Sequence, residues 1–293
     1  MGNAWVFPGQ GSQKVGMTAG VLELPGARER FAAASELLGR DLLAICEGTG
    51  DGDLADTRNT QPALFALESL LIDALKAQGR SAELVAGHSA GELVALYAAG
   101  VFDANTGLQL IKTRSELMAA AGGGAMTAVM GFDRTQLEEL VAATNGVVIA
   151  NDNSDAQVVI SGSPEAVAAV SSQLSCKRAI PLAVSGAFHS PFMAEAAGAF
   201  AQVLESVPFA DAQIPVLSNT DPTPQTEAAV LKARLTSQMI SGVRWRETMQ
   251  QLVASGINVA VEIGPGNVLS GLIKRSCPEI TTAQISTAAD LGL

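Results

Sequence analysis

Two spacings of apolar residues alternate along the first half of the chain. Short continuous apolar runs predict buried strands at residues 3–7 and 84–86, because a strand covered on both faces shows little polar alternation. Apolar residues three and four positions apart predict helices at residues 27–38, 61–78, 92–97 and 104–121. Strands that alternate with helices indicate an α/β fold with a mostly parallel sheet.

The middle of the chain follows a different order. After Gly122-Gly123-Gly124 the pattern predicts elements at residues 126–130, 134–143, 146–150, 157–161, 164–174 and 178–184. Their order, βαββαβ, is typical of a ferredoxin-like unit. We therefore expect a small inserted subdomain at residues 125–187, within a large discontinuous domain of residues 1–124 and 188–293.

Beyond the insertion the alternation of helices and strands resumes. Helices are expected at residues 193–206, 227–240 and 245–254, and strands at residues 214–218 and 258–263. The turn Gly264-Pro265-Gly266 follows, and after it a short helix and a strand. These elements complete the parallel sheet of the large domain.

The composition excludes several classes of protein. Of the 293 residues 48% are apolar and 16% are charged, which indicates a folded chain with a large core. No apolar stretch reaches the roughly 18–20 residues that span a bilayer, and no signal peptide is visible. The three cysteines have neither metal-ligand nor disulfide spacing. We expect a cytoplasmic protein without metal or membrane, and the net charge of −11 argues against nucleic acid.

Ser89 lies at the centre of Gly87-His88-Ser89-Ala90-Gly91, between a predicted strand and a predicted helix. This is the G-x-S-x-G pattern of a nucleophile elbow, in which a sharp turn strains the serine and exposes its hydroxyl. The flanking glycines are needed because strand and helix come too close for a Cβ atom. The backbone N–H after the serine is then free to bind an oxyanion.

A serine nucleophile needs a general base, and the chain has only two histidines. His88 precedes Ser89, so we expect its side chain to point away and to pack beneath the elbow. The base is then expected to be His189, which follows the last strand of the insertion. The alternative is that His189 is a hydrogen-bonded core residue.

Arg114 lies within an apolar arc of the helix at residues 104–121, together with Leu110, Ile111 and Met118. A guanidinium among apolar neighbours keeps its charge and needs an anionic partner. That partner is either a substrate carboxylate or, as a structural salt bridge, Glu92.

Four motifs together resemble the malonyl-CoA:acyl-carrier-protein transacylases, a family that includes the acyltransferase domains of polyketide synthases. They are Phe7-Pro8-Gly9-Gln10-Gly11-Ser12-Gln13, the segment 87–92, the segment 186–190 and Glu262-Ile263-Gly264-Pro265-Gly266. Their order and spacing match the family over essentially the whole chain. The resemblance implies an α/β-hydrolase-like core with a ferredoxin-like insertion.

The resemblance also implies roles for individual residues. The N–H groups of Gln10 and Ala90 would form the oxyanion hole, and Arg114 would bind the free carboxylate of the malonyl group. The backbone carbonyl of Gln238 would orient His189, so that the Gln238 side chain is expected to be dispensable. Pocket residues are expected to be Gln61, Met118, Phe188 and Asn219, with the Phe188 ring disfavouring an α-methyl group.

The expected function is transfer of a malonyl group from malonyl-CoA to the phosphopantetheine thiol of acyl carrier protein, through a malonyl-Ser89 intermediate and without a cofactor. The chain is expected to act as a monomer. Because acyl carrier protein is acidic, a basic cluster is expected to bind it, with Lys274 and Arg275 preferred over Lys177–Arg178 and Arg244–Arg246.

Other functions remain open from the sequence. The transferase could serve a polyketide or malonate decarboxylase system instead of fatty acid synthesis. A serine esterase or thioesterase shares the elbow but usually has its histidine near the C-terminus. A non-catalytic scaffold is expected to have lost Ser89, His189 or Arg114, and all three are present.

Overall fold

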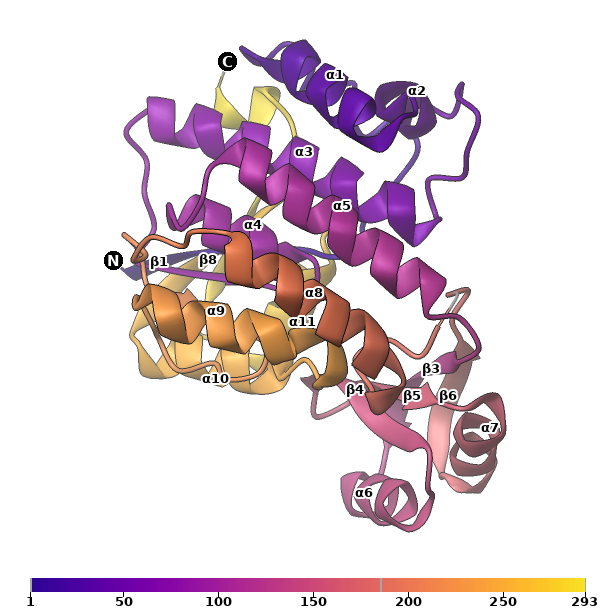
Figure 1. Ribbon diagram of the computed structural model, residues 1–293. Helices are drawn as coiled ribbons and strands as arrows, with labels where there is room; N and C mark the ends of the chain where they lie inside the picture. The colour runs from indigo at the N-terminus through magenta and orange to yellow at the C-terminus, as the bar shows by residue number, and fades with distance from the viewer. Residues whose placement is uncertain (1, 185, 293) are drawn as a thin grey trace.

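The computed structural model describes residues 2–184 and 186–292, and it contains two β-sheets with helices packed against them (Figure 1). The larger sheet has the strand order β7-β2-β1-β8-β9, and every pairing in it is parallel. Its strands are β1 (Gly2–Phe7), β2 (Leu84–Gly87), β7 (Val216–Leu217), β8 (Ile257–Ile263) and β9 (Thr281–Ile285). The predicted α/β class with a parallel sheet is confirmed. Residues 1, 185 and 293, which belong to the expected domain ranges, lie outside the described residues.

The larger sheet is buried on both faces, and strand β1 shows why. Trp5 and Phe7 contribute to one hydrophobic core, whereas Ala4 and Val6 contribute to another, because successive side chains of a strand point to opposite faces. The helices of the first core are α1 (Ala27–Leu38), α2 (Leu42–Glu47), α3 (Thr57–Ala77), α4 (Gly91–Ala98), α5 (Ala104–Ala120), α8 (Ala194–Ser206) and α9 (Ala228–Ser237); those of the second are α10 (Trp245–Ala254) and α11 (Val268–Ser276). Within the described residues, no helix has both the length and the apolar character that crossing a membrane requires.

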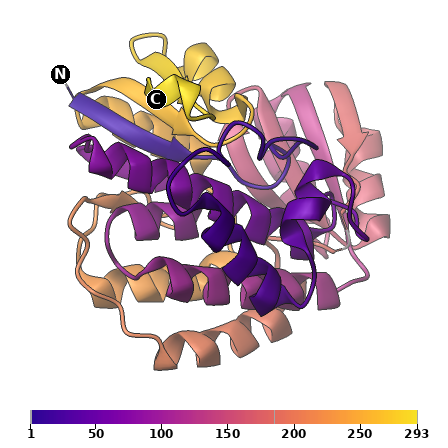
Figure 2. The ribbon, with the colours of Figure 1, turned by 90° about the horizontal axis from the view of Figure 1, so that it is seen from above.

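The smaller sheet is antiparallel and has the strand order β4-β5-β3-β6. Its strands are β3 (Ala125–Phe132), β4 (Val147–Ser154), β5 (Gln157–Gly162) and β6 (Cys176–Pro181). Helix α6 (Arg134–Ala143) connects β3 with β4, and helix α7 (Pro164–Gln173) connects β5 with β6. Figure 2 shows the smaller sheet at one side of the molecule, and its two helices share a separate small core with it. The predicted order of strands and helices in this segment is confirmed.

Helix α3 begins at Thr57, four residues before its predicted start, and it contains Pro62 in its second turn. Asp56 caps the helix by accepting a hydrogen bond from the Arg58 N–H. A proline at position 62 cannot donate to the carbonyl of Arg58, one turn earlier. The Arg40 guanidinium donates to that carbonyl instead, at 2.8 Å. A long-range contact therefore compensates for the proline.

Several other helices and strands also begin or end at residues that differ from the prediction. The helix expected at residues 227–240 is α9 followed by a 3-10 turn, Gln238–Ile240. The strand expected at residues 178–184 is shifted to β6, and the strand expected at residues 214–218 is reduced to the two residues of β7. The short helix α2 was not predicted; its six residues lie between an Asp41 cap and Gly48, too few to show a helical period.

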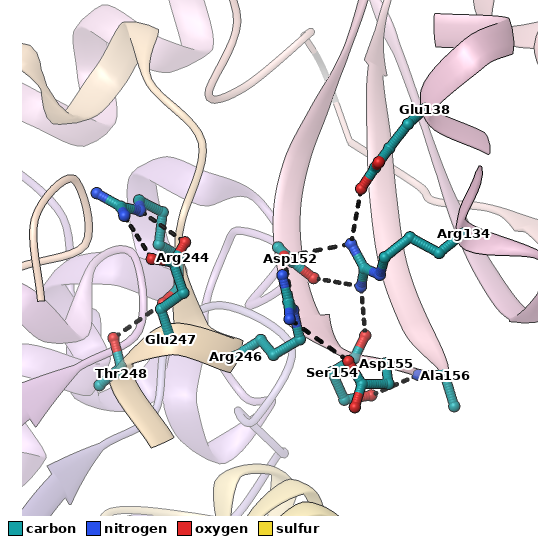
Figure 3. Close-up of polar contacts among 10 residues, drawn as sticks. All are labelled: Arg134, Glu138, Asp152, Ser154, Asp155, Ala156, Arg244, Arg246, Glu247 and Thr248. Carbon is teal, nitrogen blue, oxygen red and sulfur yellow. Dashed lines mark hydrogen bonds and ion pairs between the residues drawn. The ribbon is translucent and has the colours of Figure 1, made fainter. Parts of the chain in front are cut away.

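An ion cluster joins the smaller sheet to the larger part of the molecule (Figure 3). Asp152 of β4 accepts from Arg134 Nη2 at 2.8 Å and from Arg246 Nε of α10 at 3.0 Å. Beside it, the N–H of Asp152 donates to the Val243 carbonyl at 2.9 Å, and the N–H of Val243 donates to the Ala150 carbonyl at 2.8 Å. Half-buried charges and backbone bonds therefore fix the two parts together.

Glu68 of α3 carries a buried carboxyl group that no described residue satisfies. Burial, and then the negative charge of Glu262, raise the pKa of Glu68 well above its ordinary value of 4.5. Because the folded state favours the protonated form, its contribution to stability is complete at acidic pH. That contribution is lost as the pH rises from the unfolded toward the folded pKa.

Replacing Glu68 by Gln is expected to remove this pH dependence. The melting temperature of Glu68→Gln minus that of the parent should rise by about 2 °C or more between about pH 5 and about pH 8. Thermal unfolding across this range measures the difference. The exposed substitution Glu205→Gln is the control, and it should show no such trend. A constant difference for Glu68→Gln would contradict the expectation.

Candidate active site

Three loops that follow neighbouring parallel strands meet at one edge of the larger sheet. Gln10 follows β1, Ser89 follows β2 and Asn219 follows β7. Phe7 and Gly87 are register partners, so the first two loops leave the sheet at the same level. Carboxyl ends of adjacent parallel strands are the usual place for a site in an α/β sheet. The fold therefore brings these distant segments together.

Ser89 is strained in the manner expected of a nucleophile elbow. Its φ angle is +53°, which is uncommon for a residue with a side chain. A Cβ on Gly87 would lie 1.9 Å from the Gly91 carbonyl oxygen, and one on Gly91 would lie 2.3 Å from the Phe7 carbonyl oxygen. The close approach that the two glycines were predicted to permit is thus present on both sides of the serine.

Asn219 holds the strained backbone in place. Its Oδ1 accepts from the Ser89 N–H at 2.7 Å, and its Nδ2 donates to the Gly87 carbonyl at 2.6 Å. The expectation that Asn219 only lines the pocket was wrong. The amide spans the turn and satisfies backbone groups that the sharp bend leaves without helical or strand partners.

His189 contacts Ser89 although 100 residues separate them: its Nε2 lies 2.7 Å from Ser89 Oγ. Nδ1 lies 3.0 Å from the Gln238 carbonyl oxygen, which fixes the tautomer with the proton on Nδ1. That carbonyl lies in the 3-10 turn after α9, where its backbone donor is the Ser241 N–H at a long 3.4 Å. His189 has a φ of +56°, so both members of the pair are in the left-handed region.

The surroundings keep the His189 imidazole neutral. Burial, and then the positive charge of Arg114, lower the pKa of His189 from 6.5 to about 3. The side chain is therefore ready to accept a proton at neutral pH. His88 instead packs edge-to-face against Trp245, at a centroid distance of 5.5 Å, and its Nε2 lies 2.8 Å from Asn153 Oδ1.

Two backbone N–H groups beside Ser89 have no acceptor within the described part of the chain, and they belong to Gln10 and Ala90. The loop after β1 lies directly against the elbow, since a Cβ on Gly9 would lie 2.4 Å from the His88 carbonyl oxygen and 3.6 Å from the Ala90 nitrogen. Unpaired donors at such a point can bind a developing oxyanion.

Arg114 is fully buried and contacts neutral oxygens. Its Nη2 donates to Ser89 Oγ at 3.2 Å and its Nη1 to Gln61 Oε1 at 2.6 Å. No ion pair found among residues 2–184 and 186–292 includes it, so the alternative of a salt bridge to Glu92 was wrong. Burial lowers the pKa of Arg114 to about 10, and the charge of Glu92 opposes that shift. A positive fork thus lies one hydrogen bond from the nucleophile.

The side chain of Gln238 forms hydrogen bonds within the site, which the expectation that it is dispensable did not include. Its Oε1 accepts from Arg114 Nε at 3.2 Å and from Nη2 at 2.9 Å. Its Nε2 donates to the Ser89 carbonyl at 3.0 Å and to Glu92 Oε2 at 2.7 Å. Sequence reasoning placed this residue by its backbone alone, and the partners of its amide come from two distant segments, the elbow with the start of α4 and helix α5.

Thr57 is a residue of the site that sequence reasoning missed. Its Oγ1 accepts from Gln61 Nε2 at 2.8 Å and donates to Gln10 Oε1 at 2.7 Å. Because Gln61 also accepts from Arg114, a chain of hydrogen bonds connects the guanidinium with the loop after β1. The signal that could have identified Thr57 is its spacing from Gln61, because residues four apart on one helix lie on the same face.

A cavity of about 90 Å³ lies above Ser89, and Gln61, Met118, Phe188 and His189 are among its lining residues. It shares Gln10, His88, Asn151 and Leu182 with a cavity of about 200 Å³. That second cavity shares Gln157, Val268 and Leu272 with a surface hollow of about 370 Å³ that contains Lys274 and Arg275. The cavity above Ser89 therefore adjoins the second cavity, and the second cavity adjoins the surface hollow.

Comparison with known proteins identifies the family. Residues 4–293 match the acyl transferase domain. The chain is 50% identical to the malonyl CoA-acyl carrier protein transacylase of Synechocystis sp. strain PCC 6803, covering 100% of this chain and 99% of the relative. The crystal structure of the Synechocystis malonyl-CoA:ACP transacylase superposes with a TM-score of 0.96 at 50% identity, over 100% and 99% of the two chains. A malonyl-transacylase solved in complex with its type II polyketide acyl-carrier protein has a TM-score of 0.91 at 37% identity, over 99% and 98%.

The lowered pKa of His189 leads to an expectation for the acylation of Ser89. Because only the neutral imidazole accepts a proton, the rate should fall as the pH drops toward about 3, and not near 6.5. Replacing Arg114 by Met removes a positive charge, so the fall in rate on the acid side of the pH profile (the acid limb) should occur at a higher pH. Rapid-mixing acetylation of Ser89 by acetyl-CoA, whose acyl group carries no carboxylate, measures the limb in both proteins. A limb at the same pH in both would contradict the expectation.

Proposed function

The chain belongs to the family of malonyl CoA-acyl carrier protein transacylases, and we propose that it transfers a malonyl group from malonyl-CoA to the phosphopantetheine thiol of acyl carrier protein. The observation that carries the proposal is a single convergence at Ser89 Oγ. An imidazole nitrogen lies 2.7 Å from this oxygen, and a guanidinium nitrogen lies 3.2 Å from it. The first activates the hydroxyl, and the second offers a binding site for an acyl group that ends in a carboxylate.

The first half-reaction forms malonyl-Ser89. His189 Nε2 takes the hydroxyl proton while Ser89 Oγ attacks the thioester carbonyl, and the carbonyl oxygen becomes an oxyanion. The N–H groups of Gln10 and Ala90 bind this oxyanion, a contribution of about 3 kcal/mol per donor in related chemistry. The tetrahedral intermediate then collapses, the carbon–sulfur bond breaks, and the coenzyme A sulfur takes the proton from His189.

The second half-reaction reverses these roles with another thiol. The phosphopantetheine thiol gives its proton to His189 and attacks the ester carbonyl of malonyl-Ser89. The same two N–H groups bind the oxyanion, and Ser89 leaves with the proton from His189. The product is malonyl carrier protein, which supplies fatty acid synthesis.

Arg114 and Phe188 account for the choice of acyl group. The guanidinium fork binds the malonyl carboxylate through two parallel hydrogen bonds, which a neutral acetyl group cannot form. Phe188 lines the cavity above the serine and crowds an α-methyl group, a distinction worth about 1–3 kcal/mol.

We also assign finer names to the two parts of the fold. The βαββαβ segment has the strand order β4-β5-β3-β6, which supports a ferredoxin-like subdomain at residues 125–187. The parallel sheet with its elbow after β2 supports an α/β-hydrolase-like domain at residues 1–124 and 188–293. Because one chain supplies every proposed catalytic group, we propose that it acts as a monomer and without a cofactor. We also propose a cytoplasmic location.

The acyl carrier protein is proposed to bind at Lys274 and Arg275 of α11. Arg244 pairs with Glu247, and Arg246 pairs with Asp152 and Asp155 (Figure 3), so that cluster is already neutralised. None of the ion pairs among the described residues includes Lys274 or Arg275. Their hollow also connects with the cavities above Ser89, which suits a phosphopantetheine arm.

Single-turnover labelling tests the proposed function. Malonyl-CoA should add about 86 Da to Ser89, and added carrier protein should then receive the malonyl group. In Arg114→Ala the preference for malonyl- over acetyl-CoA should fall by about a hundredfold, because the carboxylate loses its partner. Release of free malonate as the main product would indicate a hydrolase instead. Equal labelling of the parent by acetyl-CoA would remove the role of Arg114.

Charge reversal tests the carrier-protein site. In Lys274→Glu/Arg275→Glu, the carrier-protein concentration that half-saturates transfer from preformed malonyl-Ser89 should rise by about tenfold. Lys177→Glu/Arg178→Glu is the matched control, because it makes the same charge change on the outer strand β6. Transfer to free pantetheine, which has no protein surface, should be the same in both double variants. An equal effect of the two charge reversals would contradict the assignment.

A further inference from the structure

The amide of Gln238 lies between two buried charges, the guanidinium of Arg114 and the carboxyl group of Glu92. Its oxygen accepts from Arg114 at 2.9 and 3.2 Å, and its nitrogen donates to Glu92 Oε2 at 2.7 Å. All three side chains are fully buried. The amide oxygen therefore faces the cation and the amide N–H faces the anion, so that both charges fix the same orientation.

This arrangement decides what can still bind to Arg114. A carboxylate in direct contact would form a two-pronged ion pair and occupy the guanidinium, because opposite charges then add to two parallel hydrogen bonds. In this chain the acceptors around the guanidinium are the neutral oxygens of Gln238, Gln61 and Ser89. An incoming carboxylate therefore displaces a weaker partner.

Glu92 is itself held away from Arg114. Its Oε2 also accepts from the backbone N–H of Asn219 at 3.1 Å, and its own backbone lies in the first turn of α4, directly after the elbow. Burial raises the pKa of Glu92, and the hydrogen bonds from Gln238 and Asn219 and the charge of Arg114 oppose that shift. In its ionised form the carboxylate provides a counter-charge for a desolvated cation without blocking it. A buried cation with no counter-charge at all would be far more costly.

We propose that Gln238 is a positioning residue: its neutral side chain spaces Glu92 from Arg114 and thereby reserves the guanidinium for the carboxylate of the acyl group. The inference rests on the proposed malonyl transfer and deepens it, since it names the residue that makes the site selective for acyl groups ending in a carboxylate. Gln238 reaches His189 only through its backbone carbonyl, which a side-chain substitution leaves in place.

Moving the carboxylate from position 92 to position 238 tests the spacer. The double variant Glu92→Gln/Gln238→Glu has the same net charge as the parent, but its carboxylate directly contacts Arg114. The single variant Glu92→Gln is the matched control, because it differs from the double variant only at position 238. Rapid-mixing labelling of Ser89 by malonyl-CoA and by acetyl-CoA gives a maximal rate and a half-saturating concentration for each substrate.

The double variant should lose its preference for malonyl- over acetyl-CoA by at least about tenfold relative to Glu92→Gln, mainly through a higher half-saturating concentration of malonyl-CoA. General damage to the serine and histidine would lower the labelling rates with malonyl-CoA and with acetyl-CoA in proportion, and it would leave their ratio unchanged. Glu92→Gln itself should keep the parental preference or exceed it, because the spacer is still present.

Two results would overturn the proposal: a ratio in the double variant within tenfold of that in Glu92→Gln, or a tenfold loss of preference in Glu92→Gln alone. If the double variant labels with neither substrate, Gln238→Glu is compared with the parent by the same ratio and the same threshold. Failure of the proposed function is recognised separately, since the parent itself would then not be labelled by malonyl-CoA.

Discussion

The close approach of backbone at the nucleophile elbow is the constraint on which the rest of the site depends. Gly87, Gly91 and the carbonyl of Phe7 lie so near one another that no Cβ fits between them. This contact fixes the N-terminus of α4 against the end of β1. It forces Ser89 into the left-handed region, and it places the loop of Gln10 within reach of the same point. The proposed nucleophile and the proposed oxyanion donors thus both depend on one packing contact.

Electrostatics explains how a strongly acidic chain binds an anionic acyl group. The net charge of −11 repels anions at long range, but the site is desolvated, and there the guanidinium of Arg114 contacts neutral oxygens while Glu92 is held away from it. The positive charge of Arg114 lowers the basicity of His189. In the proposed reaction, a malonyl carboxylate that pairs with Arg114 would offset this effect, so the substrate itself would restore the base that deprotonates Ser89. An acyl group without a carboxylate leaves the imidazole a weaker base.

The sequence was sufficient for features that are encoded locally. Helices α6 and α10 match their predicted ranges because their apolar periods have clear ends, and α6 is capped by Asp133. The contact between Ser89 and His189 was predictable because the elbow is a local motif and the chain offers only one other histidine. The roles of the Asn219 and Gln238 side chains were not identifiable, since their partners lie far away along the chain. The start of α3 was missed for the same reason: the group that compensates for Pro62 comes from Arg40.

The junction between the two sheets has a consequence for how substrates arrive. Asp152 is held by two arginines from opposite sides, and paired backbone bonds connect Val243 with the strand that carries it. Partly buried ion pairs of this kind are little weakened by salt, and the backbone bonds not at all. These contacts therefore oppose a swing of the two sheets away from each other. The proposed phosphopantetheine arm would then enter lengthwise, tip first, which favours carriers that present their cargo on the end of a thin tether.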